Sequence, residues 1–253
     1  MPNEIALFWL VAAGFFLFDN LVFVPAGHDM LRFGRKGRLR YSAHKRLEAS
    51  GREVVLLNPL NLFDRGVLTT HCLGDLRPAA WRTGQRQVRR ALPALNAFSW
   101  LGSTYLVIAL VLAWASFRTD FSLCLLALIL AHAVFWLIGL GLLLRRRHDL
   151  HLSGHEVFVF AAEALFVPAY LMNMGRRLVS RKKLDMPALG VGLHQLKRLA
   201  VGSVQRELLV YQLRERLATL ETNLGLELDD TPTSSSHSQQ QQWIQKARSC
   251  LTG

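Results

Sequence analysis

Long apolar runs dominate the pattern of this chain, and its polar residues gather between them. Four runs stand out: Ile5–Ala26, Ala97–Phe117, Phe121–Leu144 and Val157–Met174. A helix needs about 20 predominantly apolar residues to cross the hydrocarbon core of a bilayer. The second and third runs meet this requirement with no charged residue inside and only a short turn between them. They predict a transmembrane helical hairpin over residues 97–144.

The first and fourth runs are less regular, because each contains a carboxylate and a proline. The first run is too long and follows an acidic residue, Glu4, so it predicts a retained membrane helix over residues 1–27 and not a signal peptide. The fourth run contains Glu163 and Pro168. A carboxylate is costly in a bilayer and proline kinks a helix, so residues 155–175 predict a membrane segment that either spans or is re-entrant.

The letters FVPA occur in both of these irregular runs. The first copy follows Asp19 and Asn20, and the second copy follows Glu163. One interpretation is an internal repeat of one helix type, whose polar residues meet inside the bundle. Coincidence is the favoured interpretation, because apolar runs draw on few residue types.

Basic residues are concentrated beside the apolar runs and bear on the topology. The chain has 30 Lys and Arg residues and a net charge of +12. Basic segments remain in the cytoplasm. If all four runs cross, either Arg145–Arg147 or the cluster at 176–183 lies outside, whichever way the chain is inserted. Three crossings with a re-entrant fourth run leave only Arg118 outside, and this arrangement is preferred.

Two polar regions flank the hairpin in sequence. Residues 28–96 predict a β-rich cytoplasmic insert, with strands at Leu39–Ala49, Arg52–Asn58 and Val67–Cys72. The insert ends in a basic amphipathic helix, which is expected either to contact lipid headgroups or to be an ordinary surface helix of the insert. The basic side chains expected at the headgroups are Arg82, Arg86, Arg89 and Arg90.

The chain after the hairpin divides into four parts. A basic, His-containing loop at 145–154 precedes the fourth run. Residues 176–228 predict a cytoplasmic helical region, within which 193–224 has amphipathic helical periodicity. Residues 229–253 contain the low-complexity sequence TPTSSSHSQQQQ and predict a disordered tail.

Two groups of residues are candidates for chemistry. Ionisable and amide groups at membrane depth are functional candidates by default, and here they are Asp19, Asn20, His132 and Glu163. A second group combines imidazoles with a carboxylate, which suits zinc or iron: His148, His151, His155 and Glu156. Gly154 interrupts this group and the preceding arginines repel a cation, so a solvated loop is favoured over a metal site.

The sequence predicts a mainly α, multi-pass integral membrane protein with three to four membrane helices, a small β-rich insert and a C-terminal amphipathic helix. Nucleotide-binding and common hydrolase motifs are absent from the sequence. The favoured function is a non-enzymatic subunit or scaffold of a complex in a bacterial inner membrane. Its expected partners are anionic lipid headgroups and a protein partner or second copy, with no nucleic acid and no cofactor.

Two alternative functions remain open from the sequence. The first is a proton-coupled transport component that uses Asp19, His132 and Glu163 as titrating groups. The second is a membrane-embedded metal enzyme that uses His148 and its neighbours and acts on a lipid.

Overall fold

The computed structural model describes residues 2–25, 28–41, 47–49, 52–71, 78–230, 242–245, 247–249 and 251. The chain is mainly α-helical with small β-sheets, as the sequence predicts. Eight helices are named here: α1 Pro2–Phe18, α2 Pro78–Ser116, α3 Phe121–Arg146, α4 Gly154–Phe166, α5 Pro168–Met172, α6 Met174–Ser180, α7 Ala188–Leu196 and α8 Val204–Asp230. The strands are β1 Leu21–Val24, β2 Asp29–Phe33, β3 Leu39–Tyr41, β4 Leu47–Ala49, β5 Arg52–Leu56, β6 Arg65–His71 and β7 Lys183–Pro187.

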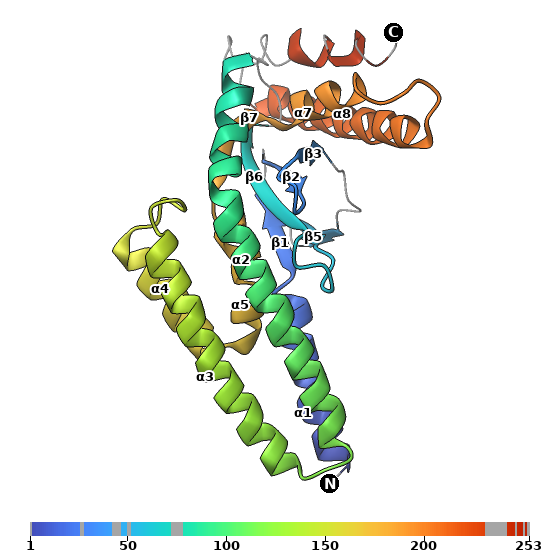
Figure 1. The fold of residues 1–253 in the computed structure, drawn as a ribbon. Coiled ribbons are helices and arrows are strands. Elements are labelled where there is room, and N and C mark those ends of the chain that lie inside the picture. The colour runs from blue at the N-terminus through green and yellow to red at the C-terminus, as the bar shows by residue number, and fades with distance from the viewer. Residues whose placement is uncertain are drawn as a thin grey trace.

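The strands form two small sheets at one end of the molecule, which we call the head together with α7 and α8 (Figure 1). The first sheet has the order β1-β5-β4 and is antiparallel. The second has the order β3-β2-β6-β7, and its β6–β7 pair is parallel. Arg216 of α8 joins the sheets from above, with its Nη1 donating to Glu53 Oε1 at 2.8 Å and its Nε 3.5 Å from Asp29 Oδ2.

In the sequence, the whole α2–α6 segment lies between the parallel strands β6 and β7. Parallel neighbours require a crossover connection, and here that connection consists of α2, α3, α4, α5 and α6. In Figure 1, α2 leaves the head, α3 returns along it, and α6 leads back to β7 beside β6. The α2–α6 segment therefore begins and ends at the same side of the molecule.

Two helices are long and apolar enough to cross a membrane by length and composition, over Gly84–Ser116 and Phe121–Arg146. They form the hairpin that the sequence predicts. One correction concerns α2, which is a single helix of 39 residues and not a surface helix followed by a separate span. Pro93 lies inside it without ending it, while buried side chains on both sides of this residue, such as Val88 and Phe98, keep one face of α2 packed.

The first apolar run is not one helix. It forms α1, ends at a turn containing Asp19 and Asn20, and continues as β1, which pairs with β5. The first FVPA copy thus begins in a strand. The second lies at the break between α4 and α5, where Val167 has extended backbone angles and Pro168 begins α5. The two copies have different structures, so they are not a repeat of one helix type.

The fourth run turns back on itself. Helix α4 ends at Phe166, and α5 and α6 lead away from this end to β7. The two flanks of the run lie together, because Lys182 Nζ donates to the carbonyl of Leu150. Arg181 also reaches back to α4, where its guanidinium lies 4.3 Å from the ring centroid of Phe160.

The C-terminal region differs from the predicted long helix and disordered tail. The predicted helix at 193–224 is divided between α7 and α8, with Gly202 at positive φ in the connection. Residues 231–241 lie outside the described residues. Farther on, Ile244, Ala247 and Leu251 are buried in the main hydrophobic core, so the tail prediction is wrong for these residues. Their spacing of three and four places them on one helical face, which explains their burial.

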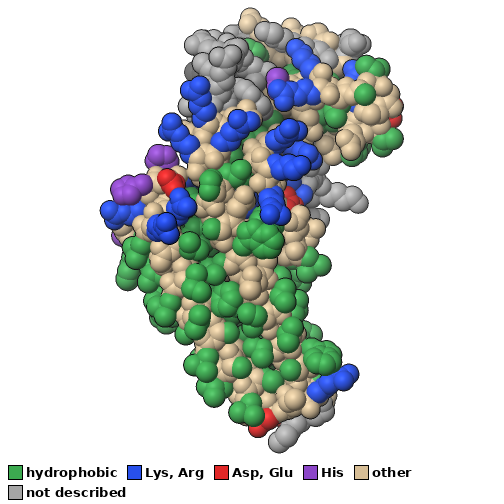
Figure 2. Space-filling model, in the orientation of Figure 1, with side chains coloured by type: hydrophobic (Ala, Val, Ile, Leu, Met, Phe, Trp, Pro, Cys, Tyr) green, Lys and Arg blue, Asp and Glu red, His purple; other side chains and the backbone are tan. Residues whose placement is uncertain are grey.

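Hydrophobic side chains cover the lower half of the face in Figure 2, around the α2–α3 hairpin, apart from its tip. Lys and Arg side chains gather over the upper half, from the level of the junction with the head. The exposed apolar side chains of α3 include Leu123, Leu126, Ile129, Leu130, Val134 and Leu137. The molecule therefore has an apolar helical part and a basic head.

The helices α2 and α5 approach each other at a glycine. A Cβ atom at Gly102 would lie 2.1 Å from the carbonyl oxygen of Met172, which is backbone and does not rotate away. We expect Gly102→Ala to lower the free energy of unfolding by about 1–3 kcal/mol or more, because the helices must separate. Gly141→Ala in α3 is the matched control, since nothing lies within 4 Å of its Cβ position. Thermal unfolding in detergent, followed by circular dichroism, compares the two variants. Equal midpoints for both would contradict this packing.

Candidate functional site

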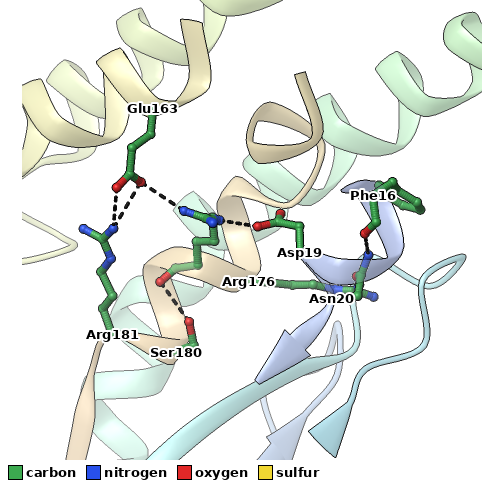
Figure 3. Close-up of polar contacts among 8 residues, drawn as sticks. Phe16, Asp19, Asn20, Glu163, Arg176, Ser180 and Arg181 are labelled. Carbon is green, nitrogen blue, oxygen red and sulfur yellow. Dashed lines mark hydrogen bonds and ion pairs between the residues drawn. The ribbon is translucent and has the colours of Figure 1, made fainter. Parts of the chain in front are cut away.

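The polar residues that interrupt the first and fourth runs meet at one arginine. Arg177 of α6 donates from Nε to Asp19 Oδ1 at 2.7 Å and from Nη1 to Glu163 Oε2 at 3.0 Å. Figure 3 labels both carboxylates, and dashed lines drawn at Asp19 and Glu163 mark these contacts. The same guanidinium stacks on Tyr170, 3.2 Å from the ring centroid. Arg177 thus links the end of α1, α4 and α6 by charge and by packing.

The two carboxylates differ in their surroundings. The side chain of Asp19 is 3% exposed, and its second oxygen has no hydrogen-bond partner among the described residues. Burial raises the pKa of Asp19 above its usual value, and the charge of Arg177 opposes this shift. Glu163 is 30% exposed and also accepts a hydrogen bond from Arg181 Nη2 at 2.9 Å. Asp19 is therefore the group that depends most on Arg177.

The neighbouring Arg176 points into the head. It donates from Nη1 to the side-chain oxygen of Asn20, and from Nη2 to the carbonyls of Asn58 and Asn61. Asn20 is fully buried and donates in turn to the carbonyl of Phe16 at the end of α1, at 2.5 Å. Arg176 thereby fixes the turn after α1 and the loop before β6 to α6. Burial lowers its pKa to about 10.

A further buried arginine, Arg65 at the start of β6, fixes the head to α2. Its Nη2 donates to Asn96 Oδ1 and to Ser99 Oγ, both at 2.8 Å. Ser99 in turn donates to the carbonyl of Leu62 at 2.9 Å. Burial, together with the charge of Arg176, lowers the pKa of Arg65 to about 10. We call Arg65, Arg176, Arg177 and Arg181 the junction arginines, because they lie where the helices meet the head.

A cavity of about 350 Å³ lies beside the junction arginines. Its lining includes Arg176, Arg177 and Ser180 of α6. It also includes Asp19, Leu21 and Phe23, which follow α1 in the chain. Each of the four charged residues that line it, Asp19, Arg176, Arg177 and Arg181, already has a hydrogen-bond partner within the protein. The cavity therefore offers space beside an ion-paired network and not an uncompensated charge.

His132 of α3 is held separately, farther along the helices. Its Nε2 lies 3.0 Å from the carbonyl oxygen of Leu165, which can only accept, so Nε2 carries a proton. Its Nδ1 lies 3.1 Å from the Tyr105 hydroxyl. Leu165 lacks its ordinary helical donor because the chain breaks before Pro168. His132 therefore compensates for the break. Trp136 also binds α4, because its Nε1 donates to the Ala161 carbonyl at 2.8 Å.

The four residues considered for a metal are not brought together as a binding site. Among the residues that the structure describes, no group of three or more His, Cys, Asp or Glu side chains is arranged to hold a metal ion. Glu156 forms a capping box with Ser153 at the start of α4. Hydrogen bonds from the backbone and side chain of Ser153 lower the pKa of Glu156. His148, His151 and His155 are exposed.

The basic residues considered for headgroup contact lie on the first part of α2. Arg86, Arg89 and Arg90 are exposed there, whereas Val88 and Ala91 are buried against the head. The side chain of Arg82 lies outside the described residues. This face of α2 is free for solvent or headgroups, but α2 itself packs as a head helix in this region.

The sequence identifies Asp19, Asn20 and Glu163 as unusual but misses their partners. Arg176, Arg177 and Arg181 appear in the sequence as one cytoplasmic basic cluster. A charge argument could have found these partners, because two carboxylates in apolar runs require buried cations. The nearest arginines after an apolar run are the natural candidates.

Comparison of the chain with protein-family models, with curated proteins and with solved structures found no match in any of the three. The functional argument therefore rests on the residues and geometry described above.

Removing the Arg177 charge leaves the Asp19 carboxylate buried without its cation. We expect Arg177→Gln to lower the free energy of unfolding by about 3 kcal/mol, the cost typical of breaking a buried ion pair. Arg181→Gln is the control and costs less than about 1 kcal/mol, since Arg181 is 46% exposed and Glu163 retains Arg177.

A double variant tests the electrostatic cause. Asp19→Asn combined with Arg177→Gln removes both charges, so part of the lost stability returns. Thermal unfolding in detergent measures all of these variants. If the double variant is less stable than the sum of the single changes, the ion pair is not the cause.

Proposed function

We propose that this protein is a non-enzymatic integral membrane protein of a bacterial inner membrane, acting as a subunit or scaffold of a membrane complex. Helices α1, α2 and α3 cross the bilayer, α4–α6 form a re-entrant element, and the head lies in the cytoplasm. The observation that carries this proposal is the return of the α2–α6 segment to β7, beside β6, in one sheet.

The pairing of β6 with β7 supports the number of crossings. Strands that are hydrogen-bonded to one another lie on the same side of a membrane, so the segment between them crosses an even number of times. Helices α2 and α3 account for two crossings. The contact of Lys182 with Leu150 supports a fourth run that enters and returns. Helix α1 adds a single crossing, which puts the N-terminus outside.

The surface of the hairpin supports insertion in lipid. In the most apolar window of α3 only 11% of the residues are buried, and in that of α2 only 33%. The core helix of a soluble protein is mostly buried, whereas these helices expose large apolar side chains such as Leu110, Trp114, Leu126 and Leu137. The basic residues around the junction, Arg145–Arg147 and Arg181 among them, then face the cytoplasm.

The junction arginines favour a scaffold over proton-coupled transport. Asp19 and Glu163 are both ion-paired with Arg177, and His132 is hydrogen-bonded to Tyr105 and Leu165. These contacts hold the head in a fixed orientation on the helices, which suits a protein that positions partners. Transport needs groups that exchange protons in turn, and among the described residues His132 shares no hydrogen bond with either carboxylate.

Single-cysteine variants test the topology. In a background with Cys72, Cys124 and Cys250 replaced by Ser, we place Cys at three exposed positions: Arg118, His148 and Val201. A membrane-impermeant thiol reagent is applied to intact spheroplasts and again after permeabilisation. We expect Arg118→Cys to react in intact spheroplasts, and His148→Cys and Val201→Cys to react only after permeabilisation.

The pair His148→Cys and Val201→Cys is the decisive comparison, because these positions flank the fourth run. Labelling of only one of them in intact spheroplasts would mean that this run crosses the bilayer. Labelling of all three in intact spheroplasts would contradict the proposed topology, because His148 and Val201 are expected to lie in the cytoplasm.

The scaffold function predicts a stable complex in the native membrane. After extraction in a mild detergent, native electrophoresis and mass spectrometry of the band are expected to show the chain with a partner of fixed stoichiometry, or with a second copy. Arg177→Gln is expected to reduce this complex, while Arg181→Gln leaves it intact. Isolation only as a lone monomer, at native expression and in several mild detergents, would contradict the proposal.

A further inference from the structure

One cavity in the head is strongly basic. It has a volume of about 780 Å³ and lies between the β2–β3 hairpin, the loop before β6, and helices α7 and α8. This volume is in the range of small-molecule sites. Its basic lining residues are Arg32, Arg35, Lys36, Arg38 and Arg40. Asp64 is the only acidic residue among the described residues that line it.

The β2–β3 hairpin concentrates these charges by its geometry. Leu39 and Tyr41 are buried in β3, so the alternating residues Arg38 and Arg40 lie on the opposite face. The register pairs Arg40 directly with Arg32 of β2. Like charges directly opposite one another destabilise an antiparallel pair. An anion between the two guanidinium groups would offset this repulsion.

The single carboxylate in the cavity does not balance this charge. Asp64 Oδ2 forms an ion pair with Arg32 Nη1 at 2.9 Å, so its charge is already used by that arginine. The Nε of Arg32 is buried and has no hydrogen-bond partner among the described residues. Arg32 therefore has a buried donor without a partner, and the cavity that it lines has an excess of positive charge.

The opposite wall is neutral and polar. Gln195 of α7 and Gln205 and Gln212 of α8 line it, together with Leu208 and Leu209. Gln195 Oε1 already accepts from the backbone N–H of Tyr41 at 3.1 Å, which sets the orientation of this amide. Amide donors opposite arginines suit a ligand that carries phosphate oxygens and further polar groups.

The hairpin turn is closed by a hydrogen bond and lies beside α2. Gly37 has a φ of +67°, and its N–H closes the turn to the carbonyl of Gly34 at 2.9 Å. The carbonyl of Arg35 accepts from Asn96 of α2 at 3.3 Å. The guanidinium of Arg35 lies 5.0 Å from the ring centroid of Trp100, a half-exposed residue where the apolar surface of α2 begins.

We propose that this cavity binds a phosphate-bearing ligand with at least two negative charges, held by Arg32, Arg35, Arg38 and Arg40. The phosphate belongs either to a soluble phosphate ester or to the headgroup of an anionic phospholipid, since Trp100 marks a position suited to the membrane interface. This site goes beyond the scaffold function and does not depend on it.

The test compares two pairs of substitutions in the full-length protein. Arg38→Gln with Arg40→Gln removes two charges from the cavity. Arg89→Gln with Arg90→Gln is the matched control, because it removes two exposed charges from α2 outside the cavity lining. Pyrophosphate and ATP are the soluble probes, measured by calorimetry in neutral detergent. The lipid arm uses phosphatidylcholine nanodiscs with and without cardiolipin, measured by the thermal unfolding midpoint.

We expect at least one arm to show binding that weakens by about tenfold or more in the cavity variant and is retained in the control. Binding of the soluble probes identifies a phosphate ester, and a rise of the midpoint with cardiolipin alone identifies a lipid headgroup. Arg35→Gln with Lys36→Gln at the turn is the second variant and is expected to weaken binding likewise. No binding in either arm, or equal weakening in the control, overturns the proposal.

The ligand-free proteins provide an independent measurement. Because Arg32 and Arg40 repel one another, Arg40→Gln is expected to leave the unfolding midpoint unchanged or to raise it in phosphate-free buffer. A lower midpoint for Arg40→Gln would show that Arg40 is held by the protein itself, and it would overturn the proposal.

Discussion

The structure depends on the hydrogen bonding of β7 to β6. This pairing is parallel, so the chain between the two strands must leave the sheet and return to it as a crossover connection. Helices α2 and α3 extend away and return, α4 packs on α3, and α6 packs on α2 and β6. The arrangement of the junction arginines follows from this closure, because it brings α6 against the end of α1 and the loop before β6.

The junction arginines show how charge is accommodated at this closure. Burying a guanidinium costs several kcal/mol unless its donors are satisfied. Arg65 and Arg176 use neutral acceptors, the Asn and Ser side chains and the carbonyls of a loop, whereas Arg177 uses the carboxylates of Asp19 and Glu163. Neutral acceptors let two cations lie near one another, and the carboxylates offset the net charge. The polar residues inside the apolar runs are thus needed by the arginines that follow them.

The sequence predicts the hairpin well because its signal is local. Two apolar runs without charges on either side of a short turn leave little choice, and the structure contains α3 and the second half of α2 there. The sequence fails where the decisive contact is distant. Strand β7 is five residues long and contains a proline, and only its pairing with β6 makes it a strand. Likewise β1 belongs to an apolar run by composition, but β5 supplies its hydrogen bonds. The acidic residues of the candidate site could be identified from the sequence, because they are charged residues in apolar runs. The arginines that pair with them could not, because the positive-inside rule already accounted for the basic cluster at 176–183.

The separation of β6 and β7 in the chain has a consequence for biosynthesis. A ribosome delivers β6 first, and its neighbour β7 emerges only after the whole helical excursion has been translated. The sheet order β3-β2-β6-β7 is therefore incomplete until the α2–α6 segment has been translated. Long-range parallel pairing is slow and late in folding. The sheet is thus completed only when the preceding helices have reached their positions. A chain whose hairpin is misplaced exposes an unpaired β6 edge, which is a template for pairing with another chain.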